Sequence, residues 1–255
     1  MKPNISEFSY GYALTSELVR LFGIKGVGAP VFPSLKEEGS VGYDVQVPGL
    51  PLFLQFKLSD EMVSATAHQS ELLVVPHLRM HLRPLRYSNQ HDLLRALEAR
   101  GNLVFYAAPE FTQPSELNDA YDRDLVLTRS ALWAPSDIGP LDGGDHHIAF
   151  RAGDSLGYIC SEPVTIRKPP AREVLVSRFR EQLRAGLAHV PTRDYFTAIA
   201  VGLREIYREE RPFAVDEGQQ DSSAAGRDPQ DDAALMAHSF FGCSLLFVPA
   251  TSFAA

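Results

Sequence analysis

Apolar and polar positions in the first part of the chain predict a helix that is followed by short strands. Apolar side chains recur at three- and four-residue steps over residues 7–22, which is typical of an amphipathic helix. Short apolar runs then begin near residues 31, 42 and 52, after a segment rich in glycine and proline. The segment 42–57, GYDVQVPGLPLFLQFK, has a proline–glycine pair between two such runs, so it predicts a β-hairpin.

The next segment, residues 76–86, predicts a strand with one apolar and one basic face. Successive strand residues point to opposite sides, so alternating residues share a face. The apolar positions are Leu78, Met80 and Leu82, and the basic positions are Arg79, His81 and Arg83. A helix is predicted over 88–100, with Ser88 as its N-cap and Gly101 at its end, and a buried strand over 102–109.

The pattern changes after residue 170, where two amphipathic helices joined by a short turn predict an αα unit. A polar segment with few apolar residues then predicts a flexible linker. We therefore expect an α+β fold with an α/β-like core, a mixed sheet flanked by helices and a C-terminal helical addition. The expected units are a core over 1–165, a helical hairpin over 171–212, a linker over 216–232, and a helix and strand over 233–255 that return to the core.

Composition and charge narrow the classes of function. The net charge of −8, from 32 acidic and 24 basic residues, argues against a surface that is coated with nucleic acid. It still allows a local basic groove. The first residues lack the order of a signal peptide, and no apolar run reaches the roughly 18–20 residues of a spanning helix. With two cysteines, Cys160 and Cys243, and no metal-site spacing, we expect a cytoplasmic protein with reduced thiols and no membrane contact.

The predicted hairpin carries an unusual set of polar residues. Asp44 lies in its first strand, and Gln55 and Lys57 end the second, giving an aspartate followed by a Gln-x-Lys motif. This motif, within the order helix, three strands, helix and strand, resembles the PD-(D/E)xK (restriction-endonuclease-like) nuclease superfamily. The resemblance covers about residues 1–110, and Gln55 departs from the usual acid in the manner of the QxK variant of Mrr-type proteins.

The resemblance implies a metal-dependent site. Asp44 would be a metal ligand, and Lys57 would polarise the attacked phosphate or position the attacking water. Gln55 can ligate Mg²⁺ (or Mn²⁺) through its carbonyl oxygen but adds no charge, so a further acid is needed. Glu38 could supply it from the entry to the hairpin, and Glu17 on the first helix is the alternative that some family members use.

Phosphate contacts are expected beside this site. The best candidate surface for phosphate contacts consists of Arg79, His81, Arg83 and Arg86. The alternative is a solvated face that is paired with Glu71 or Asp92. Gln90 and His91 lie in the first turn of the following helix, whose N-terminus favours anions.

The expected function is Mg²⁺-dependent endonucleolytic hydrolysis of DNA in a bacterial defence or restriction-like system. The alternative is a catalytically inactive member of the same fold that binds nucleic acid or protein in a complex. DNA is the expected partner, RNA is a second possibility, and a protein partner or a homo-oligomer is expected because an acidic chain would bind DNA weakly alone. The mixed charges of the helices after residue 170 suit a surface with many salt bridges or a partner-docking surface better than a DNA groove.

A second chemical centre is less well supported by the sequence. His146 and His147 are adjacent, with Asp142 and Asp145 before them, but neighbouring strand residues face opposite sides and rarely bind one ion together. Ser161 follows Cys160 without a nucleophile-elbow pattern, so the sequence assigns it no catalytic role.

Overall fold

Helices and strands are mixed along the chain, and the α+β class expected from the sequence is confirmed. The computed structural model describes residues 1–23, 25–26, 49–64, 73–83, 89–161, 164–210 and 227–252. The helices are α1 (Glu7–Phe22), α2 (Gln90–Ala99), α3 (Pro114–Asp122), α4 (Pro135–Ile138), α5 (Ala171–Arg184), α6 (Arg193–Glu210) and α7 (Pro229–Phe241). The strands are β1 (Lys25–Gly26), β2 (Gly49–Phe56), β3 (Ser59–Met62), β4 (His77–Leu82), β5 (Leu103–Pro109), β6 (Ser130–Trp133), β7 (His146–Phe150), β8 (Leu156–Ile159), β9 (Val164–Arg167) and β10 (Ser244–Pro249).

The strands form two five-stranded sheets. Sheet A has the order β1-β10-β2-β5-β6, and its only parallel pair in the described chain is β2 with β5. The chain between these two strands forms β3, β4 and then α2, which leads into β5. Sheet B has the order β3-β4-β7-β8-β9 and is antiparallel throughout. Because β3 begins three residues after β2 ends, the chain passes directly from one sheet into the other.

Sheet A is buried on both faces, and residue parity decides which face each side chain joins. In β2, Leu52 and Leu54 pack in a cluster with α1, α3 and α5, whereas Phe53 packs in a cluster with α2, α6 and α7. Strands β5 and β10 divide their side chains between the same two clusters. The odd-numbered positions at the end of β2 therefore face the α2 and α7 side.

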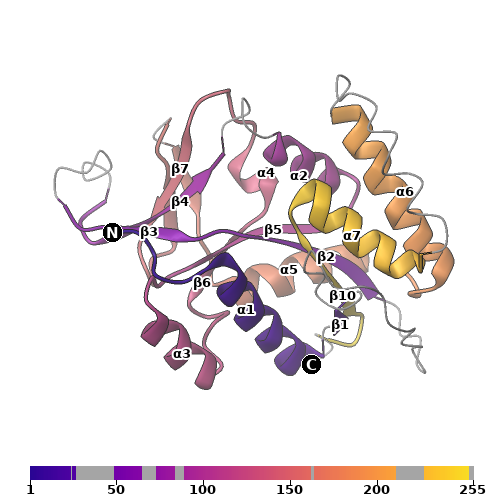
Figure 1. Cartoon of the computed structure of the whole chain (residues 1–255), viewed down its shortest axis with the longest axis horizontal. Coiled ribbons are helices and arrows are strands. Elements are labelled where there is room, and N and C mark those ends of the chain that lie inside the picture. Colours follow the sequence, from indigo (N-terminus) through magenta and orange to yellow (C-terminus); the bar gives the residue numbers. More distant parts are fainter. Residues whose placement is uncertain are drawn as a thin grey trace.

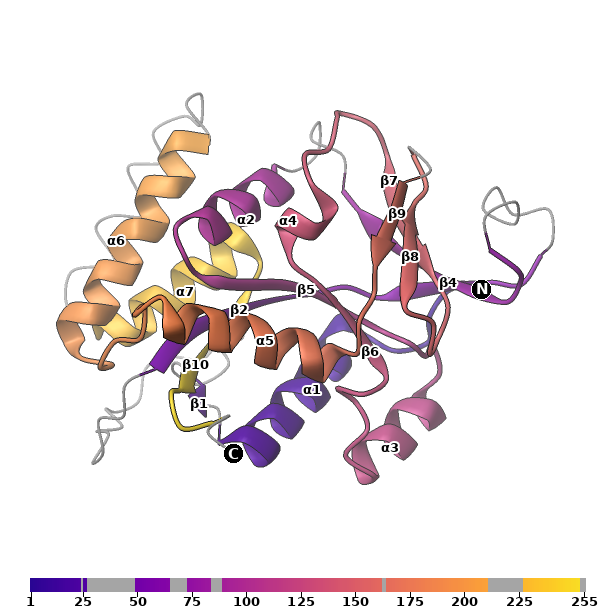
Figure 2. The same ribbon diagram turned by 180° about the vertical axis from the view of Figure 1, so that it is seen from behind.

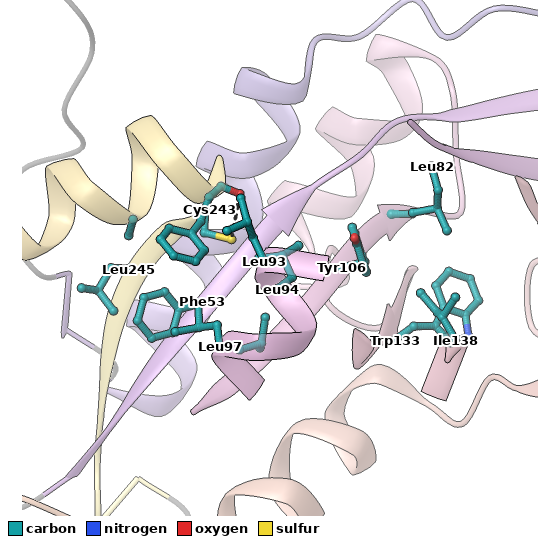
Figure 3. Packing of buried hydrophobic residues seen from close by; sticks show 14 of the residues in the cluster. Phe53, Leu82, Leu93, Leu94, Leu97, Tyr106, Trp133, Ile138, Cys243 and Leu245 are labelled. Carbon is teal, nitrogen blue, oxygen red and sulfur yellow. Dashed lines mark hydrogen bonds between the residues drawn. The ribbon is translucent and has the colours of Figure 1, made fainter. Parts of the chain in front are cut away.

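The second cluster of sheet A also reaches sheet B. Leu82, Trp133 and Ile138 pack in the same continuous core as Phe53 and Leu93. Figure 3 shows this core extending from β2, α2 and the start of β10 toward the inner face of sheet B. Figures 1 and 2 show α1 and α3 on one side of the β2–β5 strands and α2 on the other.

Several helices and strands that the periodicity predicts are present in the described part of the first half of the chain. The helix predicted over 7–22 is α1, and its N-cap Ser6 accepts a hydrogen bond from the backbone N–H of Ser9 at 3.0 Å. The predicted strand and helix around the basic segment are β4 and α2, and β5 follows them. Along β4 the three alternating leucine and methionine side chains are buried, and His81 is exposed, as a two-faced strand requires.

The hairpin predicted over 42–57 is corrected at β2. In the described chain, β2 lies between β5 and β10, and Ser244 opposes Leu54. The place expected for the strand with Asp44 is therefore occupied by a strand from the other end of the sequence. Asp44 and the two strands expected before residue 49 lie outside the described residues.

The helices after residue 170 are arranged differently from an isolated αα unit. Helix α5 packs in the cluster with α1, whereas α6 packs in the opposite cluster with α2 and α7. Helix α7 begins at Pro229, inside the range 216–232 expected to be a linker, because Asp228 provides an N-cap and proline suits the first helical position. In the part of the chain that the structure describes, no helix has the length and apolar character to cross a membrane.

Candidate functional site

Gln55 and Lys57 lie at the carboxyl end of β2, where β2 runs parallel to β5. Both have the parity of Phe53, so they face the side of sheet A that α2 and α7 cover. The connecting helix α2 begins at this end, and its first residue is Gln90. A parallel pair with its crossover helix thus brings a strand end and a helix N-terminus together, which is a common location for ligand sites in α/β sheets.

Three side chains form a hydrogen-bonded centre here. Gln90 donates from Nε2 to Oε1 of Gln55 at 2.7 Å, and its own Oε1 accepts a hydrogen bond from Nζ of Lys57 at 3.0 Å. Gln90 Nε2 also donates to the backbone carbonyl of Phe241, the last residue of α7, at 3.1 Å. Gln55 Nε2 donates to the carbonyl of Phe56 at 3.0 Å. We call Gln55, Lys57 and Gln90 the Gln–Lys–Gln centre.

Gly242 leaves room for this centre at the end of α7. Its φ of 64° is left-handed, as is usual for the glycine that follows a helix. A Cβ placed there would lie 2.5 Å from Nε2 of Gln90 and 2.8 Å from Oε1 of Gln55. Gly242 is itself exposed, so a residue at the protein surface lies directly beside this centre.

Lys57 is a buried cation with an amide as its hydrogen-bond partner. Its residue is 8% exposed, and burial lowers the pKa of its ammonium group. The positive charge of Arg83 lowers this pKa further, while the charge of Glu7 on α1 acts in the opposite direction. The carboxyl end of α7 carries the negative end of a helix dipole, which favours a nearby cation. An anion bound beside Lys57 would stabilise the charged form of its ammonium group, which burial disfavours.

The predicted basic surface divides into exposed and engaged groups. Arg83 is exposed, and its charge acts on Lys57. Arg79 is paired with Asp60 at 3.6 Å. The exposed His81 stacks on His147 with ring centroids 4.8 Å apart, and desolvation lowers the pKa of both rings, that of His147 to about 4. At neutral pH the positive charge of this basic surface therefore comes from Arg79 and Arg83.

His91 is held inside the core beside the centre. Its Nε2 donates to the carbonyl of Gly139 at 2.7 Å, which leaves Nδ1 to accept from the hydroxyl of Tyr106 at 3.0 Å. Burial lowers the pKa of the ring. His91 therefore positions α2 against β5, and both of its ring nitrogens are engaged within the protein.

Glu17 lies on the opposite side of sheet A from the Gln–Lys–Gln centre. Its carboxylate accepts hydrogen bonds from the backbone N–H groups of Val126, at 2.6 Å, and Leu127, at 3.1 Å. Both bonded residues belong to the cluster of α1, α3 and α5. The structure therefore does not bring Glu17 to Lys57, and the carboxylate anchors the segment after α3.

The residues described around Lys57 do not by themselves make a magnesium site. Gln55 already offers its oxygen to Gln90, and none of the hydrogen bonds that the described residues make to Gln55 or Lys57 comes from a carboxylate. Across the described ranges, no group of three or more His, Cys, Asp and Glu side chains is placed to hold a metal ion. Asp44 and Glu38, the acids expected as ligands, lie outside the described residues, as does Arg86.

Phe241 and Gly242 belong to the site but were missed by sequence reasoning. They lie about 150 residues after Gln90, and only the pairing of β10 with β2 brings them there. Comparisons of this chain with family models, with curated proteins and with solved structures found no match.

Proposed function

We propose that the protein hydrolyses phosphodiester bonds of DNA in a metal-dependent reaction at Lys57. The observation that carries this proposal is a buried lysine at the carboxyl end of β2 that is hydrogen-bonded to an amide. The positive charge of the exposed Arg83 acts on this lysine and lowers its pKa. A phosphate group is the ligand that such a desolvated ammonium group favours, because it supplies the missing negative charge. The Gln-x-Lys motif and the resemblance to PD-(D/E)xK nucleases give the reaction class.

In this proposal Lys57 binds the phosphate that is attacked. Its fixed positive charge stabilises the negative charge that develops on the phosphoryl oxygens. Gln90 sets the position of the ammonium group and, as the first residue of α2, presents a helix N-terminus that favours anions. Arg83 contacts a neighbouring phosphate, which fixes the position of the strand without reading its sequence.

A divalent metal ion, Mg²⁺ or Mn²⁺, would acidify the attacking water when bound. Asp44 and one of the acids Glu38 and Glu17 are the ligands implied by the resemblance. Because both oxygens of Glu17 bind backbone N–H groups, Glu38 is the stronger candidate. The place of the reaction in a defence system and a protein partner for DNA targeting belong to the same proposal.

A second candidate function is DNA binding without cleavage. It is favoured by the mutual hydrogen bonds of the Gln–Lys–Gln centre, in which Gln55 replaces an acid and uses its oxygen on Gln90. In that case Lys57 and Arg83 would hold phosphate, and no bond would be broken.

Plasmid cleavage separates the two candidates. Supercoiled DNA is incubated with wild-type protein and with Asp44→Ala, in Mg²⁺, in Mn²⁺ and in EDTA, and nicked and linear products are quantified. Metal-dependent cutting that is lost in Asp44→Ala supports hydrolysis. DNA binding that is equal in EDTA and Mg²⁺, with no cutting by the wild type, supports the binding function. Equal cutting by both proteins contradicts the assigned metal ligand.

A further inference from the structure

A second set of reactive side chains lies in sheet B, where β7 begins and β8 ends, and it is independent of the proposed nuclease function. His146 is buried, with 4% of its side chain exposed, and its imidazole ring lies between the exposed residues Asp142 and Ser161. Its Nδ1 is 2.7 Å from the hydroxyl oxygen of Ser161, and its Nε2 is 2.9 Å from a carboxylate oxygen of Asp142. The three side chains form one continuous line of hydrogen-bonding groups.

The β7–β8 hairpin builds this arrangement. Ile148 opposes Ile159 in the antiparallel pair, so continuing the same register places His146, the first residue of β7, opposite Ser161 just beyond β8. Asp142 lies four residues before His146, and its Oδ1 also accepts a hydrogen bond from the backbone N–H of Gly144 at 2.7 Å. A turn and a strand register thus hold the carboxylate on one ring nitrogen and the hydroxyl on the other.

The partners of His146 determine where its proton lies. At Nε2 the ring faces two acceptors of Asp142, the carboxylate and the backbone carbonyl, the latter at 3.2 Å, so Nε2 carries the hydrogen. Nδ1 is then an acceptor and receives the hydrogen of the Ser161 hydroxyl. This is the protonation pattern in which a histidine can act as a general base toward a serine.

We propose that Ser161 is an activated nucleophile with His146 as its general base and Asp142 as a positioning residue. A serine that is activated by a histidine base attacks acyl carbons, so the substrate class is an acyl ester. Because Ser161 is exposed, this ester would be bound at the protein surface. The Ser161 oxygen bonds to the acyl carbon while its proton passes to Nδ1 of His146. The ester bond breaks, and His146 returns that proton to the departing alkoxide. Water then attacks the acyl-serine carbon and gives its proton to His146, which returns it to the Ser161 oxygen as the carboxylic acid leaves.

A fluorophosphonate probe tests this proposal on the full-length protein. The probe would form a bond between the Ser161 oxygen and phosphorus, release fluoride and leave a stable adduct that peptide mass spectrometry can locate. The internal reference is Ser155, an exposed serine near the start of β8 that has no histidine partner in the described structure. We expect the wild type to be labelled at Ser161 at a rate at least about 100-fold above that at Ser155, which is the usual contribution of a general base.

Three variants locate the activation. Ser161→Ala should lose the label, whereas Ser155→Ala should be labelled like the wild type. Asp142→Asn keeps an Oδ1 acceptor for Gly144, so we expect an unchanged fold. It should lower the maximal labelling rate about fivefold, at an unchanged half-saturating probe concentration, because an exposed charge contributes modestly. A merely structural Asp142 would not separate these two constants in this way.

The labelling rates test the proposal without any variant that replaces a buried residue. Labelling of Ser161 no faster than that of Ser155 in the wild type would overturn the proposal. Equal maximal rates for wild type and Asp142→Asn would remove Asp142 from it. Because the labelling map of the wild type requires no variant, a folding defect in Ser161→Ala would not prevent the test.

Discussion

Replacing Gly242 by alanine should disrupt the Gln–Lys–Gln centre through one added methyl group. Gly242 and Gly23 provide a matched pair, because each follows a helix in nearly the same left-handed conformation, with φ of 64° and 60°. A Cβ at Gly242 would meet Gln90 and Gln55 at 2.5 and 2.8 Å, whereas no described atom lies within 4 Å of a Cβ at Gly23.

The backbone term should be common to both substitutions, about 1–2 kcal/mol for a non-glycine residue in this conformation. At Gly242 the amide of Gln90 must also move. That movement breaks its hydrogen bonds to Gln55 and to the Phe241 carbonyl, each worth about 0.5–1.5 kcal/mol. We therefore expect Gly242→Ala to be less stable than Gly23→Ala by about 1–3 kcal/mol.

Urea unfolding followed by fluorescence measures this difference, because Trp133 is the single tryptophan and is fully buried. Only Gly242→Ala should also weaken DNA binding, since Gln90 holds the ammonium group of Lys57. Equal losses of stability in the two variants would refute the contact between Gly242 and the centre. Unchanged DNA binding in Gly242→Ala would refute its functional consequence.

Three further predictions concern charged residues. Burial lowers the pKa of Lys57, so the folded state binds this proton less tightly than the unfolded chain, and the wild type gains stability as pH rises from 7 toward 10.5. Lys57→Met lacks this gain, so its stability relative to the wild type should decrease over the same pH range. Unfolding curves that show a constant difference would contradict this. Glu17→Gln should lower the free energy of unfolding by about 1–3 kcal/mol in thermal or urea unfolding, because an amide cannot accept hydrogen bonds from both N–H groups with two oxygens. DNA cleavage should be unchanged in this variant. Loss of cleavage in a folded Glu17→Gln protein would restore Glu17 as a metal ligand. Arg83→Ala should weaken DNA binding and reduce the slope of log affinity against log salt concentration by about 1. Arg79→Ala, which loses an ion pair with Asp60, should change this slope less. Equal slopes for the two variants in binding titrations would contradict the prediction.

The local elements of this fold could be predicted from the sequence. Helix α1 follows from its apolar spacing and from Ser6, whose side chain caps it. Strand β4 follows from strict alternation, because the buried positions Leu78 and Met80 share one face. These signals lie within a few neighbouring residues, so they need no knowledge of distant contacts.

The pairing of distant segments could not be predicted in the same way. A hairpin is the simplest partner for β2 by sequence distance, yet β10 pairs with it through Ser244 and Leu54, which are 190 residues apart. An apolar run such as that of β10 indicates that a strand is buried on both faces, but it does not indicate which strand it pairs with. The placement of α5 and α6 on opposite faces of sheet A follows from the same long-range choices.

The candidate site was predicted in part. Gln55, Lys57 and Gln90 were assigned from the motif and from the start of the following helix, and the structure brings these three together. The opposite position of Glu17 depends on the burial of its α1 face against the segment after α3. A helical pattern shows which residues are internal but does not show which neighbour they meet.

The most direct measurement is single-turnover nicking of supercoiled plasmid in Mg²⁺ by the wild type, Lys57→Ala and Lys2→Ala. Lys2 is an exposed lysine, with 86% of its side chain accessible, and it pairs with Asp60 at the surface, so it controls for the loss of one positive charge. We expect cutting by the wild type and Lys2→Ala, and loss of cutting in a folded Lys57→Ala. Undiminished cutting by Lys57→Ala would contradict the assignment of Lys57 as the residue that binds the attacked phosphate.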